Sequence, residues 1–198
     1  MENPYSSPES AAPPEIVPKP SQITVFGILH ILAAVAGFGT LLFSMASSKS
    51  PNATFLEAFQ QEKDSQVSFT PEALEGLDKA LSLNIYFEVF TAVLATMLLT
   101  SGLAMLLNAR WGISLSNKYA FLSIGLKIIS LVLVALVVAP GYQAFCDGIT
   151  GADTTFVNTI CITMKITSFV SPLATMIYPI LALILLNRPS VKKYQASL

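Results

Sequence analysis

The stretch from Tyr119 to Ala139 reads YAFLSIGLKIISLVLVALVVA and holds a single charged residue, Lys127. A helix needs about 20 apolar residues to cross the roughly 30 Å of bilayer hydrocarbon, so this stretch is long enough to span a membrane. Three more apolar runs of similar length lie at residues 23–46, 85–107 and 166–186. Because lipid cannot hydrogen-bond a free backbone N–H or C=O, we predict four spanning helices.

The composition agrees with a lipid environment. Hydrophobic residues make up 53% of the 198 positions and charged residues 12%, whereas soluble domains average about 25% charged residues. The net charge of −1 provides no attraction for nucleic acid. We expect the lipid bilayer as the immediate partner, and other membrane proteins or a second copy of the chain as further ones.

The chain divides into a tail, a membrane domain and a second tail. Six prolines in residues 1–21 predict a disordered, Pro-rich tail. Residues 22–187 form the predicted four-helix transmembrane domain, and residues 188–198 form a short C-terminal tail. The predicted connections are an outer loop at 47–84, an inner loop at 108–118 and an outer loop at 140–165.

Basic residues orient these segments. The 108–118 loop and the C-terminal tail together carry five basic residues and no acidic one. By the positive-inside rule both belong in the cytoplasm, and an even number of spans then places the N-terminus there too. We expect Trp111, Tyr119 and Tyr194 to lie at the headgroup level of the inner boundary.

The first outer loop contains a helix-start signal. Thr70-Pro71-Glu72 combines a capping hydroxyl, a proline at the first helical position and an acid in the first turn. We expect this helix to run without a break into the second span. Leu74, Leu77 and Leu81 form one apolar stripe, and residues 55–59 contain a second. Together they predict a small helical cap on the extracytoplasmic face.

Cys146 and Cys161 are the only cysteines and fall in the same predicted outer loop. An oxidising compartment would join them in a disulfide, which stabilises by about 3 kcal/mol for a loop of this size. Two free buried thiols are the alternative. Redox catalysis is disfavoured because no CxxC motif is present.

His30, Glu88 and Lys127 are candidate functional residues because polar and charged side chains inside a membrane are costly. At 1.5 Å per residue, Glu88 lies roughly 6 Å from the outer end of its span. His30 and Lys127 each lie about 12 Å from the inner end of theirs, so they share a level. A His–Lys pair facing a cavity would be a plausible proton or anion site.

Structural roles are open for the same three residues. Glu88 can reach the outer interface or meet Lys165, and Lys127 can extend its ammonium to the headgroups. His30 can hydrogen-bond a neighbouring helix.

Small residues and prolines suggest how the helices pack. Ala33 with Gly37, and Ala36 with Thr40, have the spacing of close helix contacts. Two prolines in the fourth run are expected to kink it.

Two stretches resemble a known group of proteins. The group consists of small uncharacterised four-helix membrane proteins of planctomycete-like bacteria. Residues 102–120 (GLAMLLNARWGISLSNKYA) resemble the turn between spans two and three of these proteins. Residues 3–8 (NPYSSP) resemble their NPYxSP-type N-terminal tail. The resemblance implies the same topology and a bacterial inner membrane. It implies no activity.

A function follows only in outline. No catalytic motif is present, and one histidine with two cysteines provides no cluster for a zinc or haem site, so we expect no enzyme, metal or cofactor. We favour a non-enzymatic structural or interaction component of the membrane. The alternative is a small transporter or ion-conducting subunit that uses His30, Glu88 or Lys127.

Overall fold

The computed structural model describes residues 17–46, 68–151 and 153–198. Most of the predicted tail at 1–21 and the second apolar stripe at 55–59 lie outside these residues. The described elements are α1 (Ser21–Ala46), β1 (Ser68–Phe69), α3 (Pro71–Ser82), α4 (Asn84–Leu106), α5 (Trp111–Leu133), the π-helical turn η1 (Val134–Val138), α6 (Ala139–Asp147), β2 (Ile149–Thr150), α7 (Thr154–Leu186) and α8 (Pro189–Ser197).

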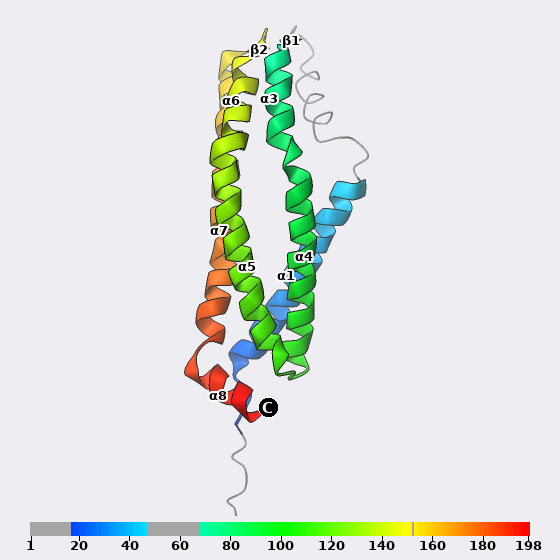
Figure 1. Ribbon diagram of the computed structural model, residues 1–198, viewed down its shortest axis with the longest axis vertical. Helices are drawn as coiled ribbons and strands as arrows, with labels where there is room; N and C mark the ends of the chain where they lie inside the picture. Colours follow the sequence, from blue (N-terminus) through cyan, green and yellow to red (C-terminus); the bar gives the residue numbers. More distant parts are fainter. Residues whose placement is uncertain (1–16, 47–67, 152) are drawn as a thin grey trace, which may run out of the picture.

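Four helical rods are long and apolar enough to cross a membrane: α1, α3 with α4, α5 with α6, and α7. The predicted all-α class with four candidate spans is therefore confirmed. The second and third rods hold 36 and 37 residues, which corresponds to about 55 Å at 1.5 Å per residue. That length exceeds the roughly 30 Å of bilayer hydrocarbon. The result is an elongated bundle (Figure 1).

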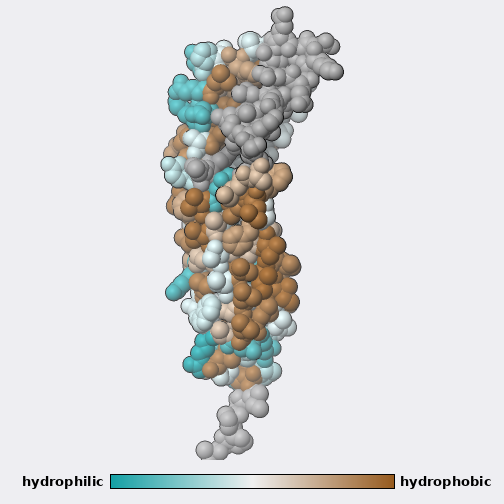
Figure 2. Space-filling view, turned by 90° about the vertical axis from the view of Figure 1, so that its right-hand side faces the viewer, coloured by the Kyte–Doolittle hydropathy of each residue, from teal (hydrophilic) through white to brown (hydrophobic). Residues whose placement is uncertain are grey.

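A belt of large, exposed apolar side chains surrounds the bundle. It extends from Val25 to Met45 on α1 and from Ile162 to Ile184 on α7, a rise of about 30 Å in each case. This height matches the hydrocarbon thickness. Figure 2 shows apolar side chains over the middle of one face and hydrophilic ones near both ends. We call the end with residues 107–110 and α8 the base, and the end with β1 and β2 the tip.

A tight turn joins α4 to α5 at the base. Asn108 has a positive φ of 58°, and the Ala109 N–H donates to the Ala104 carbonyl at 2.8 Å. Asparagine tolerates this left-handed conformation at a helix end. Because α5 already begins at Trp111, the turn is shorter than the predicted 108–118 loop, and Lys118 lies within the helix.

The base holds a hydrophobic core to which five helices contribute. The Tyr194 hydroxyl of α8 donates to the Asn108 side chain at 3.0 Å. Tyr194 and Tyr119 are buried in the bundle, whereas Trp111 is exposed. The core residues are Ile23, Phe26, Met105, Ile113, Ala182, Leu186, Val191 and Tyr194.

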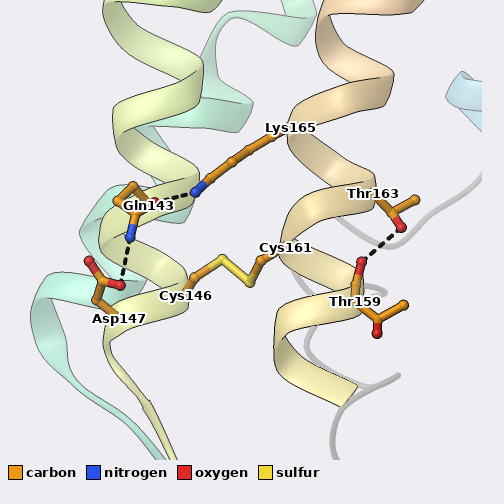
Figure 3. The surroundings of a disulfide bond; sticks show 7 residues. All are labelled: Gln143, Cys146, Asp147, Thr159, Cys161, Thr163 and Lys165. Atoms are coloured by element: carbon orange, nitrogen blue, oxygen red, sulfur yellow. Dashed lines mark hydrogen bonds between the residues drawn. A yellow bond between two sulfur atoms is a disulfide. The ribbon is translucent and has the colours of Figure 1, made fainter. Parts of the chain in front are cut away.

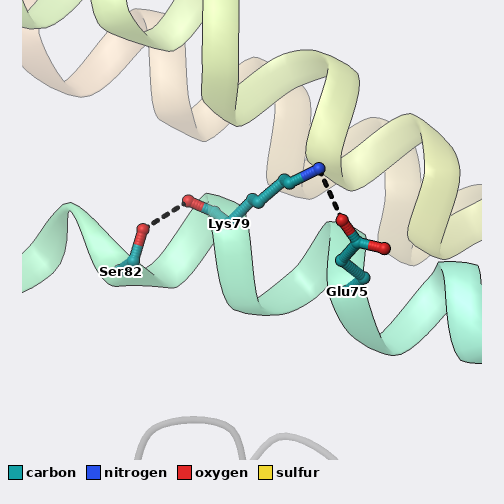
Figure 4. A network of polar contacts seen from close by, with 3 residues as sticks. All are labelled: Glu75, Lys79 and Ser82. Atoms are coloured by element: carbon teal, nitrogen blue, oxygen red, sulfur yellow. Dashed lines mark hydrogen bonds and ion pairs between the residues drawn. The ribbon is translucent and has the colours of Figure 1, made fainter.

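At the tip, α3 begins where the sequence predicts. The Ala73 N–H donates to the Thr70 hydroxyl at 3.3 Å, and α3 ends at Ser82 with a one-residue break before α4. The predicted unbroken helix is therefore wrong. An exposed ion pair joins Glu75 and Lys79 at 2.7 Å, and Ser82 donates to the Lys79 carbonyl (Figure 4).

Three helices, α3, α6 and α7, continue past the apolar belt and pack together at the tip. A Cβ placed on Gly141 of α6 would lie 2.5 Å from the Gly76 carbonyl oxygen of α3, so only glycine permits this approach. The two-stranded pairing of Phe69 with Ile149 ties the start of α3 to the turn after α6. Most of the predicted 140–165 loop is helical, because α6 ends at Asp147 and α7 begins at Thr154.

Candidate functional site

His30 lies where α1 crosses two other helices. Its Nε2 atom is 2.8 Å from the Ser116 hydroxyl of α5, and its Nδ1 atom is 2.5 Å from the Tyr178 hydroxyl of α7. The imidazole is 0% exposed. The predicted hydrogen bond to a neighbouring helix is therefore present twice, and it links three of the four rods.

Aromatic rings surround this imidazole. The ring centroids of Phe26, Tyr119 and Tyr178 lie 6.1, 5.9 and 5.6 Å from that of His30. On the α4 side, a Cβ placed on Gly102 would lie 3.0 Å from the His30 Cβ. Residues of all four spanning rods therefore meet at His30.

A histidine bonded to a serine hydroxyl has the geometry of a base beside a nucleophile. Ser116, however, is 0% exposed, so a substrate cannot reach its hydroxyl in this arrangement. Interhelical hydrogen bonds of this kind hold membrane helices together. We therefore assign His30, Ser116 and Tyr178 to helix association.

Lys127 lies on α5 and points toward α7. Its ammonium donates to the Thr175 hydroxyl at 2.6 Å, and within the described residues this is its one hydrogen bond. The side chain is half-buried. Lys127 therefore does not snorkel free of the bundle, and it does not pair with His30.

A groove of about 440 Å³ begins at Lys127 and Thr175. Its floor is α5, and its two walls are α4 and α7. Among the described residues that line it, none belongs to α1 and none is acidic. The lining residues are Leu83, Tyr86, Phe87, Phe90, Thr91, Leu94, Leu126, Lys127, Ile129, Ser130, Leu133, Ser171, Pro172 and Thr175.

The groove exists because α1 leaves the bundle. Near the base, Phe26 and His30 of α1 contact Tyr178 of α7. Farther along, Gly37 lies against Ala95 of α4, and Figure 1 shows α1 passing behind α4 and away from α7 toward the tip. In the tip-side half of the belt, α1 therefore leaves the space between α4 and α7 uncovered.

Polar side chains follow the seam between α5 and α7 from base to tip. Those on α5 recur at helical spacing of three to seven residues, and those on α7 recur every three or four. This spacing is visible in the sequence, but hydroxyl groups are common within apolar runs, so the pattern alone does not identify a functional seam. The seam consists of Ser116, Ser123, Lys127 and Ser130 on α5, and Ser171, Thr175 and Tyr178 on α7.

Glu88 stands apart from both features. It lies half-buried on α4 and is not among the residues that line the groove. The sequence allows Glu88 to reach the outer interface or to meet Lys165, and in the structure the Lys165 ammonium donates to the Gln143 side chain of α6. The three predicted candidates therefore lie apart: His30 at the buried junction, Lys127 in the groove, and Glu88 on α4 outside both.

Cys146 of α6 and Cys161 of α7 form a disulfide, with Cα atoms 6.2 Å apart. Beside it, Gln143 donates to Asp147 at 2.7 Å and accepts from Lys165 (Figure 3). The bridge and these side-chain bonds fasten α6 to α7 at the tip-side edge of the apolar belt.

Within the described ranges, no three His, Cys, Asp or Glu side chains gather into a possible metal site. Comparison of the chain with protein-family models, with curated proteins and with solved structures gave no match. Function must therefore be argued from the geometry of the groove and of the junction at His30.

Proposed function

We propose that this chain is a multi-pass protein of a bacterial inner membrane, with both termini in the cytoplasm. The four apolar rods support the membrane assignment, and the basic residues near the base support the orientation. The tip, with its disulfide, then lies in the oxidising compartment outside the cytoplasm.

Within that membrane, we propose a non-enzymatic role in binding. The groove between α4 and α7 receives another component of the membrane from the side. One observation carries this proposal: the groove lies within the apolar belt, and α1, which would close it in a compact bundle, contributes no residue to it. Uncovered concave surfaces with mostly apolar linings are the usual form of ligand sites.

The exposure of its rim supports lateral entry. Tyr86 is 62% exposed and Ile129 is 56% exposed, although both line the groove. Side chains at this height face hydrocarbon, so a hydrophobic ligand can enter without crossing water. The buried junction at His30 closes the groove on its base side.

A small transporter or ion-conducting subunit is the second candidate. The polar seam along α5 and α7 favours it, because hydroxyl and ammonium groups can replace water around a polar solute. Ser123 is 1% exposed and Ser116 is 0% exposed. The base-side half of the seam is therefore closed, and transport would require α1 to move.

Site-specific photocrosslinking tests the binding role. Phe90 lines the groove and is 43% exposed, whereas Leu122 faces outward from α5 with 42% exposure and does not line it. A benzophenone amino acid placed at either position in cells reports what lies there. We expect an adduct of one defined mass at position 90 and a mixture of bulk lipids at position 122. Identical adduct profiles would contradict the proposal.

Vesicles reconstituted with pure protein address the second candidate. A proton or anion flux above that of empty vesicles, lost in Lys127→Met and in His30→Ala, would favour transport over binding. We expect no such flux.

A further inference from the structure

Lys127 lies near the middle of the bilayer. Asn187 of α7 donates to Asn117 of α5, and this polar contact marks the base-side edge of the belt. Lys127 is ten residues farther along α5, a rise of about 15 Å. Half of the roughly 30 Å hydrocarbon layer is the same distance.

The charge of this ammonium is uncompensated in the described structure. Its hydrogen bond goes to the neutral Thr175 hydroxyl, and no carboxylate occurs among the described residues that line the groove. Charged side chains at this depth are costly and normally pair with an opposite charge. An anion in the groove would provide that pairing.

The shape of the groove selects a slender ligand. Its volume of about 440 Å³ falls in the range of small-molecule sites, about 300–1,000 Å³, and is too small to enclose a helix about 10 Å wide. A second groove of about 470 Å³ continues toward the tip and shares Phe87, Ser130, Ser171 and Pro172 with the first. Together they form an elongated groove with Lys127 at its base-side end, and several hydroxyl-bearing residues of α7 line its tip-side half.

We propose that the groove binds a long-chain fatty acid from the surrounding bilayer, with its carboxylate on Lys127 and Thr175. The alkyl chain then lies along α4 and α7 toward the tip. This inference rests on the proposed binding role of the groove and names the class of its ligand.

A carboxylic acid fits this depth better than a phospholipid headgroup does. Hydrocarbon favours the neutral form of a carboxylic acid, so the acid can reach Lys127 uncharged. Transfer of its proton to the neutral amine form of Lys127 then gives the paired carboxylate and ammonium. A phosphodiester stays ionised, and its chains begin at the interface rather than at the midplane. Phosphatidylglycerol therefore serves as the competing anionic source in the test.

Titration of the purified full chain in detergent, followed by native mass spectrometry, tests the inference. The probes are oleic acid, oleyl alcohol with the same chain, and phosphatidylglycerol. We expect one oleic acid per chain, bound roughly tenfold to a hundredfold more tightly than oleyl alcohol, as a charge-assisted hydrogen bond implies. Equal binding of acid and alcohol, or preferred binding of phosphatidylglycerol, would overturn it.

Variants locate the binding. Lys127→Gln should lose the preference for the acid and Lys127→Arg should keep it, while Lys118→Gln, an exposed lysine on the same helix, should match the parent protein. If Lys127→Gln keeps the preference, the inference fails. Oleyl alcohol binding and the melting temperature verify that each variant is folded.

A groove-filling variant separates this inference from the binding role. Thr91 lines the groove, and its hydroxyl donates only to the Phe87 carbonyl of its own helix. Thr91→Trp should abolish oleic acid binding. If the parent protein binds oleic acid and oleyl alcohol equally well and Thr91→Trp abolishes both, the fatty-acid inference is wrong and the binding role stands. If it changes no binding and position 90 yields no defined adduct, both are wrong.

Discussion

His30 shows how one polar side chain can connect three membrane helices. Both of its ring nitrogens lie within hydrogen-bond distance of hydroxyl groups, one on Ser116 and one on Tyr178. In a bilayer these groups have no water as an alternative partner. The pairing therefore sets the position of α1 against α5 and α7 near the base.

A double-mutant cycle measures this connection. We expect Tyr178→Phe and His30→Phe each to lower the free energy of unfolding, with a coupling energy of about 1 kcal/mol, because interhelical hydrogen bonds in membranes reach about that value. Denaturant unfolding in mixed micelles provides the measurement. Gln143→Ala at the tip is the control, since its effect should add to that of His30→Phe. A coupling energy between His30→Phe and Tyr178→Phe that is smaller than the experimental error would contradict the assignment of these residues to helix association.

Asp153 is a single-residue helix cap that responds to pH. Its carboxylate accepts from the Thr155 N–H at 2.6 Å and from the Phe156 N–H at 3.2 Å. The backbone hydrogen bonds from Phe156 and Thr155 lower the pKa of Asp153 below its ordinary value. A lowered folded pKa means that the cap stabilises α7 above the unfolded pKa and is lost as the pH falls through the folded pKa.

We therefore expect the amide protons of Thr155 and Phe156 to exchange faster, relative to the intrinsic rate, as the solution becomes acidic below the ordinary Asp range. Asp153→Asn should remove that pH dependence while keeping a cap. Hydrogen exchange read by mass spectrometry provides the measurement. An unchanged pH dependence in Asp153→Asn would show that another group is responsible.

At the scale of elements, two close helix approaches organise the bundle. A Cβ on Gly102 would lie 2.7 Å from the Gly27 carbonyl oxygen, and this contact joins α4 to α1 near the base. Gly76 and Gly141 provide the corresponding approach of α3 to α6 at the tip. Small residues permit such packing where lipid offers no hydrophobic driving force between helices.

Gly102→Ala tests the base contact. The added methyl group meets backbone rather than a flexible side chain, so we expect a loss of about 1–3 kcal/mol in unfolding free energy. Gly125→Ala is the matched control on α5, because a Cβ there meets nothing within 4 Å. Melting temperatures in one detergent compare the two variants. Equal melting temperatures for Gly102→Ala and Gly125→Ala would mean that α1 and α4 separate readily.

At the scale of the whole molecule, three rods are longer than the bilayer is thick. The part of α1 within the described residues ends at Ala46, close to the last exposed apolar residues of its belt. The other rods continue to a tip that the disulfide and the strand pair hold together. The tip is thus a helical projection beyond the apolar belt.

Fusion proteins test which way this projection points. We expect a C-terminal alkaline phosphatase fusion to be inactive and a C-terminal green fluorescent protein fusion to be fluorescent. The reason is that the base carries the basic residues and therefore belongs in the cytoplasm. Alkaline phosphatase inserted after Gly151, in the turn between β2 and α7, should be active. The reverse pattern would invert the proposed topology.

The sequence by itself determined the number of candidate spans, the all-α class and the start of α3. These depend on run length, composition and local capping, which neighbouring residues decide. It also indicated His30 and Lys127 as candidate functional residues, because ionisable side chains are rare in apolar runs.

Only the tertiary structure decided what those residues contact. Ala36 and Thr40 have contact spacing but are exposed, whereas Gly37 does meet α4, because the tilt of α1 selects which face packs. That same tilt buries His30 and leaves the groove above Lys127 uncovered. Tilt and rotation arise from packing between helices far apart in the chain, and no periodicity within one run encodes them.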